Sequence, residues 1–304
     1  MTIYQIVRKK RAQRMKIIDR IQSGLTLSFE VFPPKSDRPL EPLLSTLERL
    51  YALSPDFISC TYGAMGSNKG RNLEVVRSIQ ESGTCEALSH YTCVGNSRAD
   101  VLSALSDYEA AGVENLLALR GDFPSGVTQT QGFFAHANEL IAFIRAQTDR
   151  FSLAAACYPE KHLLAESIDA DIDALLKKQD AGAAFLMTQL CYSVENYLRF
   201  IDRARKGGVR LPIVAGVLPL LKKDGLVRMT LSNGCSIPAE VAALVGRYGE
   251  SEESFRAAGH AFTVSLVRRL IQEGASGIHL YTLNRFEDVA NLVYDAGIRE
   301  KPHY

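Results

Sequence analysis

Polar and titratable side chains recur in this chain at the ends of short apolar segments. Each of them could transfer a proton or hold a ligand by hydrogen bonds. These residues are Glu30, Thr61, His90, Thr92, Arg120, Asp122, Tyr158, Glu160, His162, Gln189, Tyr281 and Arg285. Core packing gives no reason for so many apolar segments to end in polar groups. If the segments are neighbouring strands, the pattern predicts one ligand site at their shared edge.

The residue types at this edge favour some reactions over others. No serine or cysteine stands in a recognisable nucleophile motif with a histidine, so hydrolase chemistry is not indicated. The six cysteines are scattered, without a C-x-x-C pair or a histidine at zinc spacing, and no metal site is expected. An acid such as Glu30, with Asp122 and several amide or aromatic groups, suits a bound organic cofactor. Such a cofactor carries the difficult chemistry, while the protein orients it and supplies protons.

Each candidate also has a purely structural interpretation. Glu30 could be an ion-paired carboxylate of the core, and His90 a buried histidine whose nitrogens are satisfied by neighbours. Gln189, between apolar residues, could bond only to backbone groups. The R-G-D tripeptide at 120–122 is common and carries little information alone. The coincidence of all four at matching segment ends is what favours a site.

The segments that must position these groups alternate between strand and helix. Runs rich in β-branched or apolar residues predict strands at 25–32, 57–62, 87–93, 115–120, 152–158, 185–190, 212–217 and 277–281. Helical patterns lie near 41–54, 70–82, 98–112, 134–148, 168–182, 194–207, 222–233, 254–274 and 284–296. Several helices are expected to end at a glycine, namely Gly83, Gly112, Gly182, Gly207 and Gly274. The alternation predicts a parallel sheet.

Two parallel architectures fit this order, a closed barrel and an open doubly wound sheet. An open dinucleotide-binding sheet favours G-x-G-x-x-G after its first strand, whereas 25–32 runs into Pro33 and Pro34. We therefore predict an α/β fold, a single (β/α)8 TIM barrel over 1–304, with its active site at the carboxyl ends of the strands. Residues 1–24 are expected to form an N-terminal helical extension, and glycines interrupt 222–253 into an irregular excursion with short helices.

Composition argues against several classes of protein. The chain has 304 residues, 46% of them hydrophobic, and its net charge of +1 does not favour nucleic acid or an anionic membrane as a partner. We interpret the basic run at 8–11 as the solvated face of an amphipathic helix. No segment approaches the ~18 apolar residues of a membrane span, and no signal peptide is recognised. A cytoplasmic protein with reduced cysteines is the simplest expectation.

Several strings match one family in order along the chain. They are SFEVFPPK at 28–35, TYGA at 61–64, HYTC at 90–93, NLLALRGD at 115–122, ACYPEKH at 156–162, DAGA at 180–183, TQ at 188–189 and YTLNR at 281–285. The combination resembles the methylenetetrahydrofolate reductase family, and the likeness covers essentially the whole predicted barrel.

The resemblance implies a non-covalently bound FAD and the reduction of 5,10-methylenetetrahydrofolate to 5-methyltetrahydrofolate. In the family, reduced nicotinamide gives a hydride to the flavin and leaves, and folate then takes the hydride at the same site. Glu30 matches the general acid that protonates the departing ring nitrogen, a role that requires a raised pKa. Asp122 matches a residue between flavin and pterin whose charge stabilises the iminium cation. Gln189, Tyr281 and Arg285 match residues that bind the substrate.

The resemblance also implies a set of flavin contacts. They are Thr61, His90, Arg120, Gly121, Asp122, Ala156, Tyr158, His162, Asp171 and Lys178, of which Lys178 would offset phosphate charge. NAD(P)H is implied as the electron donor, and a homo-oligomer is the family-level expectation. No basic pocket for a 2′-phosphate distinguishes NADPH from NADH.

Four positions depart from the family pattern. Lys223 replaces an aromatic residue, His136 a tyrosine, Ser193 a frequent aspartate and Ala174 an asparagine. These changes leave open a variant whose flavin is reduced by a partner electron-transfer subunit. They also leave open a flavin-independent hydride transfer, which the presence of His90, Asp171 and Lys178 opposes. A non-catalytic flavin- or pterin-binding subunit is a further alternative, although such a subunit has no need of the acid.

Overall fold

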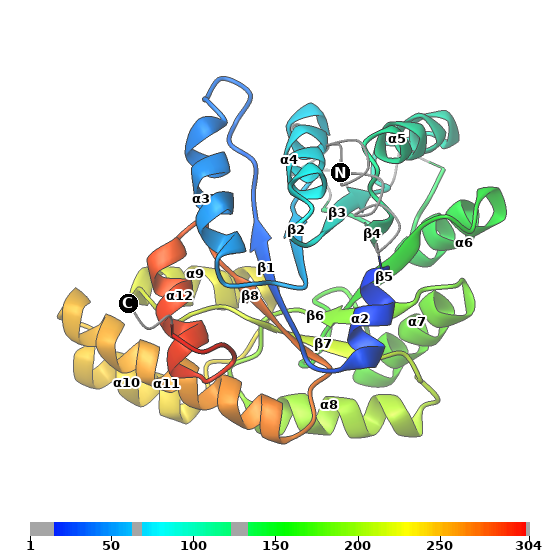
Figure 1. Cartoon of the computed structure of the whole chain (residues 1–304). Helices are drawn as coiled ribbons and strands as arrows, with labels where there is room; N and C mark the ends of the chain where they lie inside the picture. Colours follow the sequence, from blue (N-terminus) through cyan, green and yellow to red (C-terminus); the bar gives the residue numbers. More distant parts are fainter. Residues whose placement is uncertain (1–14, 63–68, 123–132, 302–304) are drawn as a thin grey trace.

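Eight parallel strands form a closed barrel in which each strand pairs with the next and β8 pairs with β1 (Figure 1). The computed structural model describes residues 15–62, 69–122 and 133–301. The strands are β1 Thr26–Val31, β2 Phe57–Cys60, β3 Glu86–Thr92, β4 Asn115–Leu119, β5 Ser152–Cys157, β6 Phe185–Thr188, β7 Ile213–Val217 and β8 Gly277–Tyr281. The predicted TIM barrel is confirmed, and each predicted strand is present within two residues of its expected ends.

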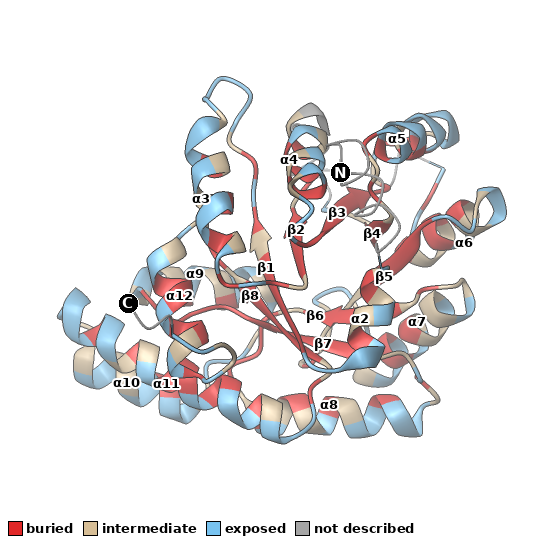
Figure 2. Ribbon diagram, in the orientation of Figure 1, coloured by how far each residue is buried: buried red, intermediate tan, exposed pale blue. Residues whose placement is uncertain are grey.

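Helices surround the barrel, with their buried faces turned to the strands and their outer faces exposed (Figure 2). They are α3 Glu41–Tyr51, α4 Lys69–Ser82, α5 Arg98–Ala110, α6 Ala137–Gln147, α7 Ile168–Asp180, α8 Val194–Lys206, α9 Lys223–Asn233, α10 Ala239–Tyr248, α11 Glu252–Gln272 and α12 Phe286–Asp295. Three helices, α9 to α11, connect β7 to β8. The short α9 and α10 are the predicted excursion at 222–253.

Glycines end several of these helices, as the sequence predicts, with one difference. Gly182 follows α7 with φ 103°, and the amide of Ala183 donates to the carbonyl of Lys178, so the chain turns directly into β6. At the end of α8 the expected glycine, Gly207, keeps a helical φ of −72°. The left-handed residue is Gly208, with φ 100°, because the helical conformation continues for one more residue.

Apolar side chains fill the amino-terminal half of the barrel interior. They are Phe57, Leu88, Leu117, Ala154, Phe185, Met187 and Val214. Helix α2, Ile17–Ser23, covers this end, because Ile17 and Ile21 pack into the same cluster. The amide of Ile17 donates to Asn115 Oδ1 at 3.0 Å, which satisfies a buried asparagine at the start of β4. The predicted N-terminal extension therefore acts as a plug, although residues 1–14, including the basic run, lie outside the described residues.

The interior becomes polar one layer further along the strands. Side chains alternate along a strand, so Ser28 and Glu30 of β1 point to the same side as His279 and Tyr281 of β8. The register pairs Ser28 with His279 and Glu30 with Tyr281. The polar layer thus lies at the carboxyl ends of the strands, above the apolar layer.

Candidate active site

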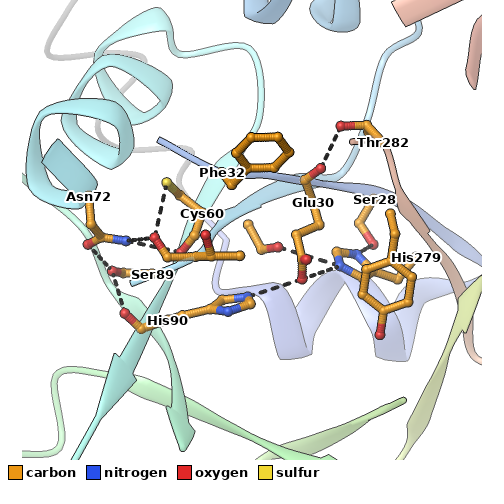
Figure 3. Close-up of polar contacts among 12 residues, drawn as sticks. Ser28, Glu30, Phe32, Cys60, Asn72, Ser89, His90, His279 and Thr282 are labelled. Atoms are coloured by element: carbon orange, nitrogen blue, oxygen red, sulfur yellow. Dashed lines mark hydrogen bonds and ion pairs between the residues drawn. The ribbon is translucent and has the colours of Figure 1, made fainter. Parts of the chain in front are cut away.

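Glu30 stands near the end of β1 with an imidazole on either side of its carboxylate (Figure 3). Its Oε2 lies 3.6 Å from Nε2 of His90 on β3 and 3.7 Å from Nε2 of His279 on β8. The side chain of Glu30 is 22% exposed, whereas those of His90 and His279 are 9% and 1% exposed. Solvent or a ligand can therefore reach the carboxylate, while both histidines contact it from inside the barrel.

The two histidines lower the pKa of Glu30. Burial raises the pKa of Glu30, but the neighbouring imidazoles of His279 and His90 outweigh this effect, so the pKa lies below its ordinary value. The sequence-based expectation of a raised pKa is therefore wrong for the unliganded protein. The reason is that three residues from strands far apart in the sequence converge on one carboxylate.

His90 itself is held in its neutral form. Burial lowers its pKa, and the nearby charge of Glu30 only partly opposes this effect. Its Nε2 is buried and forms no hydrogen bond. A buried ring nitrogen without a partner, next to a solvent-accessible carboxylate, is a position where a ligand could complete the hydrogen bonding.

A second group of predicted residues gathers at the ends of β4 and β5. Lys178 of α7 donates from Nζ to the carbonyl oxygen of Ala156 at 2.8 Å, and Asp171 accepts from the amide of His162 at 2.8 Å. The rings of Tyr158 and His162 meet edge to face, with centroids 4.6 Å apart. The structure thus brings these predicted residues close together.

Burial lowers the pKa of the basic side chains in this second group. Burial lowers the pKa of Lys178, and Arg120 lowers it further, while Cys157 and Asp171 act in the opposite direction. His162 also has a lowered pKa, first from burial and then from Arg120. An anionic partner stabilises a cation that burial disfavours. The surroundings of Lys178 therefore suit a phosphate or pyrophosphate.

The R-G-D tripeptide forms the rim between these two groups. Gly121 has φ 88°, and a Cβ there would lie 3.0 Å from Cβ of Thr92, so a side chain would meet both strain and a close contact. The side chain of Arg120 donates from Nε to the carbonyl of Gly121 at 3.1 Å. Asp122 is exposed, and its charge raises the pKa of Tyr158 after burial and other neighbours. Residues 123–132, which follow it, lie outside the described residues.

Thr61 directly follows β2 and is half-buried. Its backbone carbonyl accepts a hydrogen bond from Nδ2 of Asn72, which also donates to the carbonyl of Cys60. Oδ1 of Asn72 accepts from the hydroxyls of Ser89 and Tyr108 (Figure 3 shows the first). The buried Asn72 of α4 thus holds the end of β2, a role that the sequence analysis did not predict.

The predicted substrate residues lie at the carboxyl ends of β6 and β8. Gln189 uses both ends of its amide, donating to Asn233 Oδ1 at 2.9 Å and accepting from the amide of Leu190 at 2.8 Å. Tyr281 donates its hydroxyl to the carbonyl of Thr188 at 2.9 Å, directly before Gln189. Burial, followed by the charge of Glu30, raises the pKa of Tyr281, so the phenol remains protonated.

Arg285 lies further out, at the start of α12. Its guanidinium is 43% exposed and lies 3.9 Å from Asp288 Oδ2. Asp288 also pairs with Arg256 of α11. Arg285 is therefore within the rim but does not contact Glu30 or Gln189.

His279 was not predicted from the sequence; it is completely buried on β8, next to Ser28 and Glu30. The only sequence signal was its spacing, because His279 precedes Tyr281 by two residues and must share its face of the strand. Ser28, two residues before Glu30, carries the same signal and lies 2.8 Å from Nδ1 of His279.

The four residues that depart from the family pattern lie in different parts of the fold. Lys223 begins α9, with Nζ 3.2 Å from Glu250 Oε1. His136 is an exposed residue before α6, and Ala174 is half-buried in α7. Ser193 caps α8 by accepting from the amide of Asn196, which is the local role an aspartate would fill.

Neither a metal-binding cluster nor a membrane-spanning helix is found in the described ranges. Residues 15–62, 69–122 and 133–301 contain no group of three or more His, Cys, Asp or Glu side chains arranged to hold a metal ion. None of the helices in the same ranges has the length and apolar character that crossing a membrane requires.

Comparison with known proteins gives consistent matches. The family model for methylenetetrahydrofolate reductase matches residues 14–297. The Escherichia coli protein named 5,10-methylenetetrahydrofolate reductase is 32% identical over 279 residues, covering 92% of this chain and 93% of that protein. The Arabidopsis thaliana protein named methylenetetrahydrofolate reductase (NADH) 1 is 34% identical over 302 residues, covering 93% of this chain and 51% of that protein. The chain therefore spans about half the length of the plant relatives it matches.

A comparison of structures agrees on the fold. A Clostridium thermocellum protein, described as binding two copies of 5-methyl-5,6,7,8-tetrahydrofolic acid, superposes with a TM-score of 0.64 at 14% identity. The match covers 93% of this chain and 98% of that protein, and at this identity it supports the fold alone. From the family model and the bacterial and plant relatives, we conclude that the chain belongs to the methylenetetrahydrofolate reductase family.

Proposed function

We propose that this protein reduces 5,10-methylenetetrahydrofolate to 5-methyltetrahydrofolate with a non-covalently bound FAD. Membership of the family supports the reaction class. The observation that carries the proposal is the Glu30 carboxylate, which is accessible at the barrel mouth and contacted by two buried histidines. A protein that only binds a pterin has no need of a protonatable group in this position.

The residues at the ends of β4 and β5 fit FAD. Lys178 supplies a buried cation for a phosphate oxygen, with Arg120 and His162 beside it. His90 offers a buried ring nitrogen that forms no hydrogen bond to the protein. Thr61, Gly121, Ala156, Tyr158 and Asp171 complete the proposed flavin site. When bound there, FAD supplies the hydride that the methylene carbon receives.

Glu30 is proposed to deliver the accompanying proton. Opening the five-membered ring of the substrate leaves electrons on a nitrogen, which must be protonated as the carbon–nitrogen bond breaks. The exposed part of Glu30 faces the mouth, where that nitrogen would lie. Asp122 is proposed to stabilise the positive charge that ring opening creates on the substrate. Gln189, Tyr281 and Arg285 are proposed to hold the folate.

Reduced nicotinamide is the proposed electron donor, in line with the name of the Arabidopsis relative. The exposed His136 and the ion-paired Lys223 favour a second candidate, in which a partner electron-transfer subunit reduces the flavin. Both positions depart from family residues that would otherwise contribute aromatic surface. The two candidates share the same folate chemistry.

One experiment tests the proposal and separates the two electron donors. The purified protein would be loaded with FAD, made anaerobic, and titrated first with NADH and then with methylenetetrahydrofolate. Bleaching by NADH and return of the oxidised spectrum with folate is the expected result. A flavin that ignores NADH and NADPH but is reoxidised by folate after chemical reduction would identify a partner donor. Failure to bind FAD at all would overturn the flavin assignment.

The Glu30→Gln variant tests the acid. The amide keeps the size of the carboxyl group but cannot donate a proton of similar acidity. We expect it to keep bound FAD and its reduction by the donor, while folate turnover falls by roughly 100-fold or more. Full folate turnover in this variant would show that Glu30 is not the proton donor.

A further inference from the structure

His279 occupies a position between Glu30 and the interior of the barrel. It is completely buried, stacks on Phe57 with ring centroids 5.9 Å apart, and meets the ring of Tyr281 edge to face. Its Nε2 faces Glu30 Oε2 at 3.7 Å and Ser59 Oγ at 3.4 Å. The imidazole therefore has a fixed plane and directs one nitrogen at the carboxylate (Figure 3).

Ser28 fixes the other ring nitrogen. Its Oγ lies 2.8 Å from His279 Nδ1 and 3.4 Å from the carbonyl oxygen of Ile278. The hydroxyl can donate to this carbonyl while it accepts a hydrogen bond from Nδ1–H. A hydrogen on Nδ1 is thereby stabilised whether the ring is neutral or cationic, so the hydrogen that can be exchanged is the one on Nε2, facing Glu30.

We propose that His279 and Glu30 form one proton-donating pair, in which His279 holds the proton that Glu30 passes to the substrate. The inference rests on the proposed function, because it assigns the source of the proton that the reduction consumes. His279 acts only through Glu30 and is a positioning and proton-holding residue.

The proposed step balances in atoms and charge. The Glu30 carboxylate takes the Nε2 proton of the His279 imidazolium, which becomes neutral and keeps its Nδ1 hydrogen on Ser28. The methylene carbon gains a hydride, the carbon–nitrogen bond of the ring breaks, and its electron pair takes that proton from the carboxyl group of Glu30, which returns to the carboxylate. One proton from solvent, entering through the exposed side of Glu30, restores the imidazolium. Because 3.7 Å exceeds a hydrogen bond, Glu30 must swing toward His279 during the exchange, which its partly exposed side chain permits.

The surroundings favour the pair over Glu30 alone. Because His279 helps to lower the pKa of Glu30, the carboxyl by itself is a poor proton donor near neutrality, whereas the coupled pair keeps one proton to a pH above that lowered pKa. The other titratable groups that face Glu30 are His90 from β3, Cys60 from β2 and Tyr281 from β8. His90 is neutral because burial lowers its pKa, and burial raises the pKa of both Cys60 and Tyr281, so these two keep their protons.

The first test measures the Glu30 carboxyl directly, without turnover. Wild-type protein and His279→Gln would be labelled with 13C at glutamate side chains and titrated by NMR, with Glu30→Gln identifying the Glu30 signal. The glutamine amide can still donate to Glu30 but cannot hold a second proton. We expect the pKa of Glu30 to rise in His279→Gln, because burial then outweighs the remaining influence of His90. An unchanged Glu30 titration would overturn the proposal.

The second test follows the folate half-reaction as a function of pH. In the wild type, the rate should persist to alkaline pH, as long as the pair retains its proton. In His279→Gln, the rate should be lower by roughly 10- to 100-fold above about pH 8 and approach the wild-type rate as the pH falls toward about 6. A loss of rate that is equal at every pH would mean that His279 only supports the structure.

Phe57→Leu is the matched control. It removes the ring stacked on His279 but leaves every group that carries the proton. We expect a lower free energy of unfolding, while the rate of the folate half-reaction falls at the same alkaline pH as in the wild type. A fall that moves as far in pH in Phe57→Leu as in His279→Gln would assign the effect to packing. If Glu30→Gln retains folate turnover, Glu30 is not the proton donor and the pair is overturned while the reductase function stands. Wild-type protein that binds no FAD and turns over no folate would overturn the proposed function instead, which separates the two conclusions.

Discussion

At the scale of single residues, the position of a polar side chain depends on the space that neighbouring residues leave for it. Tyr281, one of the predicted substrate residues, is an example. Its phenol reaches across β7 to the carbonyl of Thr188 on β6, and the residue that it crosses is Gly216. A Cβ at Gly216 would lie 2.3 Å from the Thr188 oxygen and 2.7 Å from the Tyr281 hydroxyl oxygen. The position of Tyr281 therefore depends on the absence of a side chain on the neighbouring strand.

Gly216→Ala is expected to displace Tyr281 and weaken folate binding. The backbone carbonyl cannot move without disturbing β6, so the tyrosine must. We expect a loss of about 1–3 kcal/mol in the free energy of unfolding, a higher KM for folate and unchanged FAD content. Urea unfolding followed by circular dichroism and steady-state kinetics would measure both. Gly246→Ala in α10 is the control, because its Cβ meets nothing within 4 Å, and unaltered kinetics in both variants would contradict the prediction.

The positive charge of Lys178, which is proposed to bind FAD, is expected to lower the free energy of unfolding of the FAD-free protein. Its pKa is lowered in the folded state by burial, so the unfolded chain binds more protons over the range between the lowered and the ordinary value. The charged form is thus unfavourable at neutral pH, and this cost disappears as the pH rises through that range. We expect Lys178→Met to stabilise the FAD-free protein at neutral pH by about 1 kcal/mol, an advantage lost at alkaline pH, and to weaken FAD binding. A variant that is less stable at neutral pH would refute the prediction.

At the scale of elements, α2 links the predicted extension to the barrel core. The amphipathic pattern of the sequence predicted a helix packing against a larger body. The structure adds that the body is the open end of the barrel, where Ile17 and Ile21 close the apolar layer. Barrel strands bury both faces, so an end without a cover would expose apolar interior side chains.

Ile17→Ala tests the plug. Ile17 is completely buried, and its truncation should leave a cavity at the end of the barrel. We expect a loss of about 2–5 kcal/mol in the free energy of unfolding. Gln22→Ala changes an exposed residue of the same helix and should stay close to wild type. Equal stability of the two variants would show that α2 does not close the core.

At the scale of the whole molecule, the site exists only when the barrel is closed. Ser28 and His279 are 251 positions apart in the sequence, yet they meet because β1 pairs with β8. The proposed flavin residues come from the carboxyl ends of β2 to β5 and from α7, and the proposed folate residues come from β6, β8 and the loop that follows β8. A ligand that bridges these segments binds the closed barrel and not the unfolded chain.

FAD is therefore expected to stabilise the entire barrel. At a free concentration of about 100 times its dissociation constant, it should raise the free energy of unfolding by about 2.7 kcal/mol. Because the chain contains no tryptophan, far-ultraviolet circular dichroism is the suitable probe. Lys178→Met should gain less at the same FAD concentration. A melting temperature that does not depend on FAD would contradict the proposed site.

The sequence by itself determined the barrel, the order of its elements and most residues at its mouth. Periodic apolar runs and helix-ending glycines are local signals, and strands of a parallel barrel deliver their last residues to one rim. For this reason Glu30, His90 and Gln189 could be predicted to lie at one rim before any contact was known, whereas Lys178 of α7 was predicted only from the family resemblance. The expected ends of the elements were off by a few residues at most, as at β2, which ends at Cys60.

Only the tertiary structure decided how these groups behave. The lowered pKa of Glu30 contradicts the expectation from its proposed role, and His279, which helps to lower it, was not predicted. The bond from Gln189 to Asn233 likewise joins residues 44 positions apart. Proton affinity and hydrogen bonding depend on distances through space, and these distances are set when β8 closes onto β1. Local sequence patterns determine which face a residue takes, but not which distant residue it meets there.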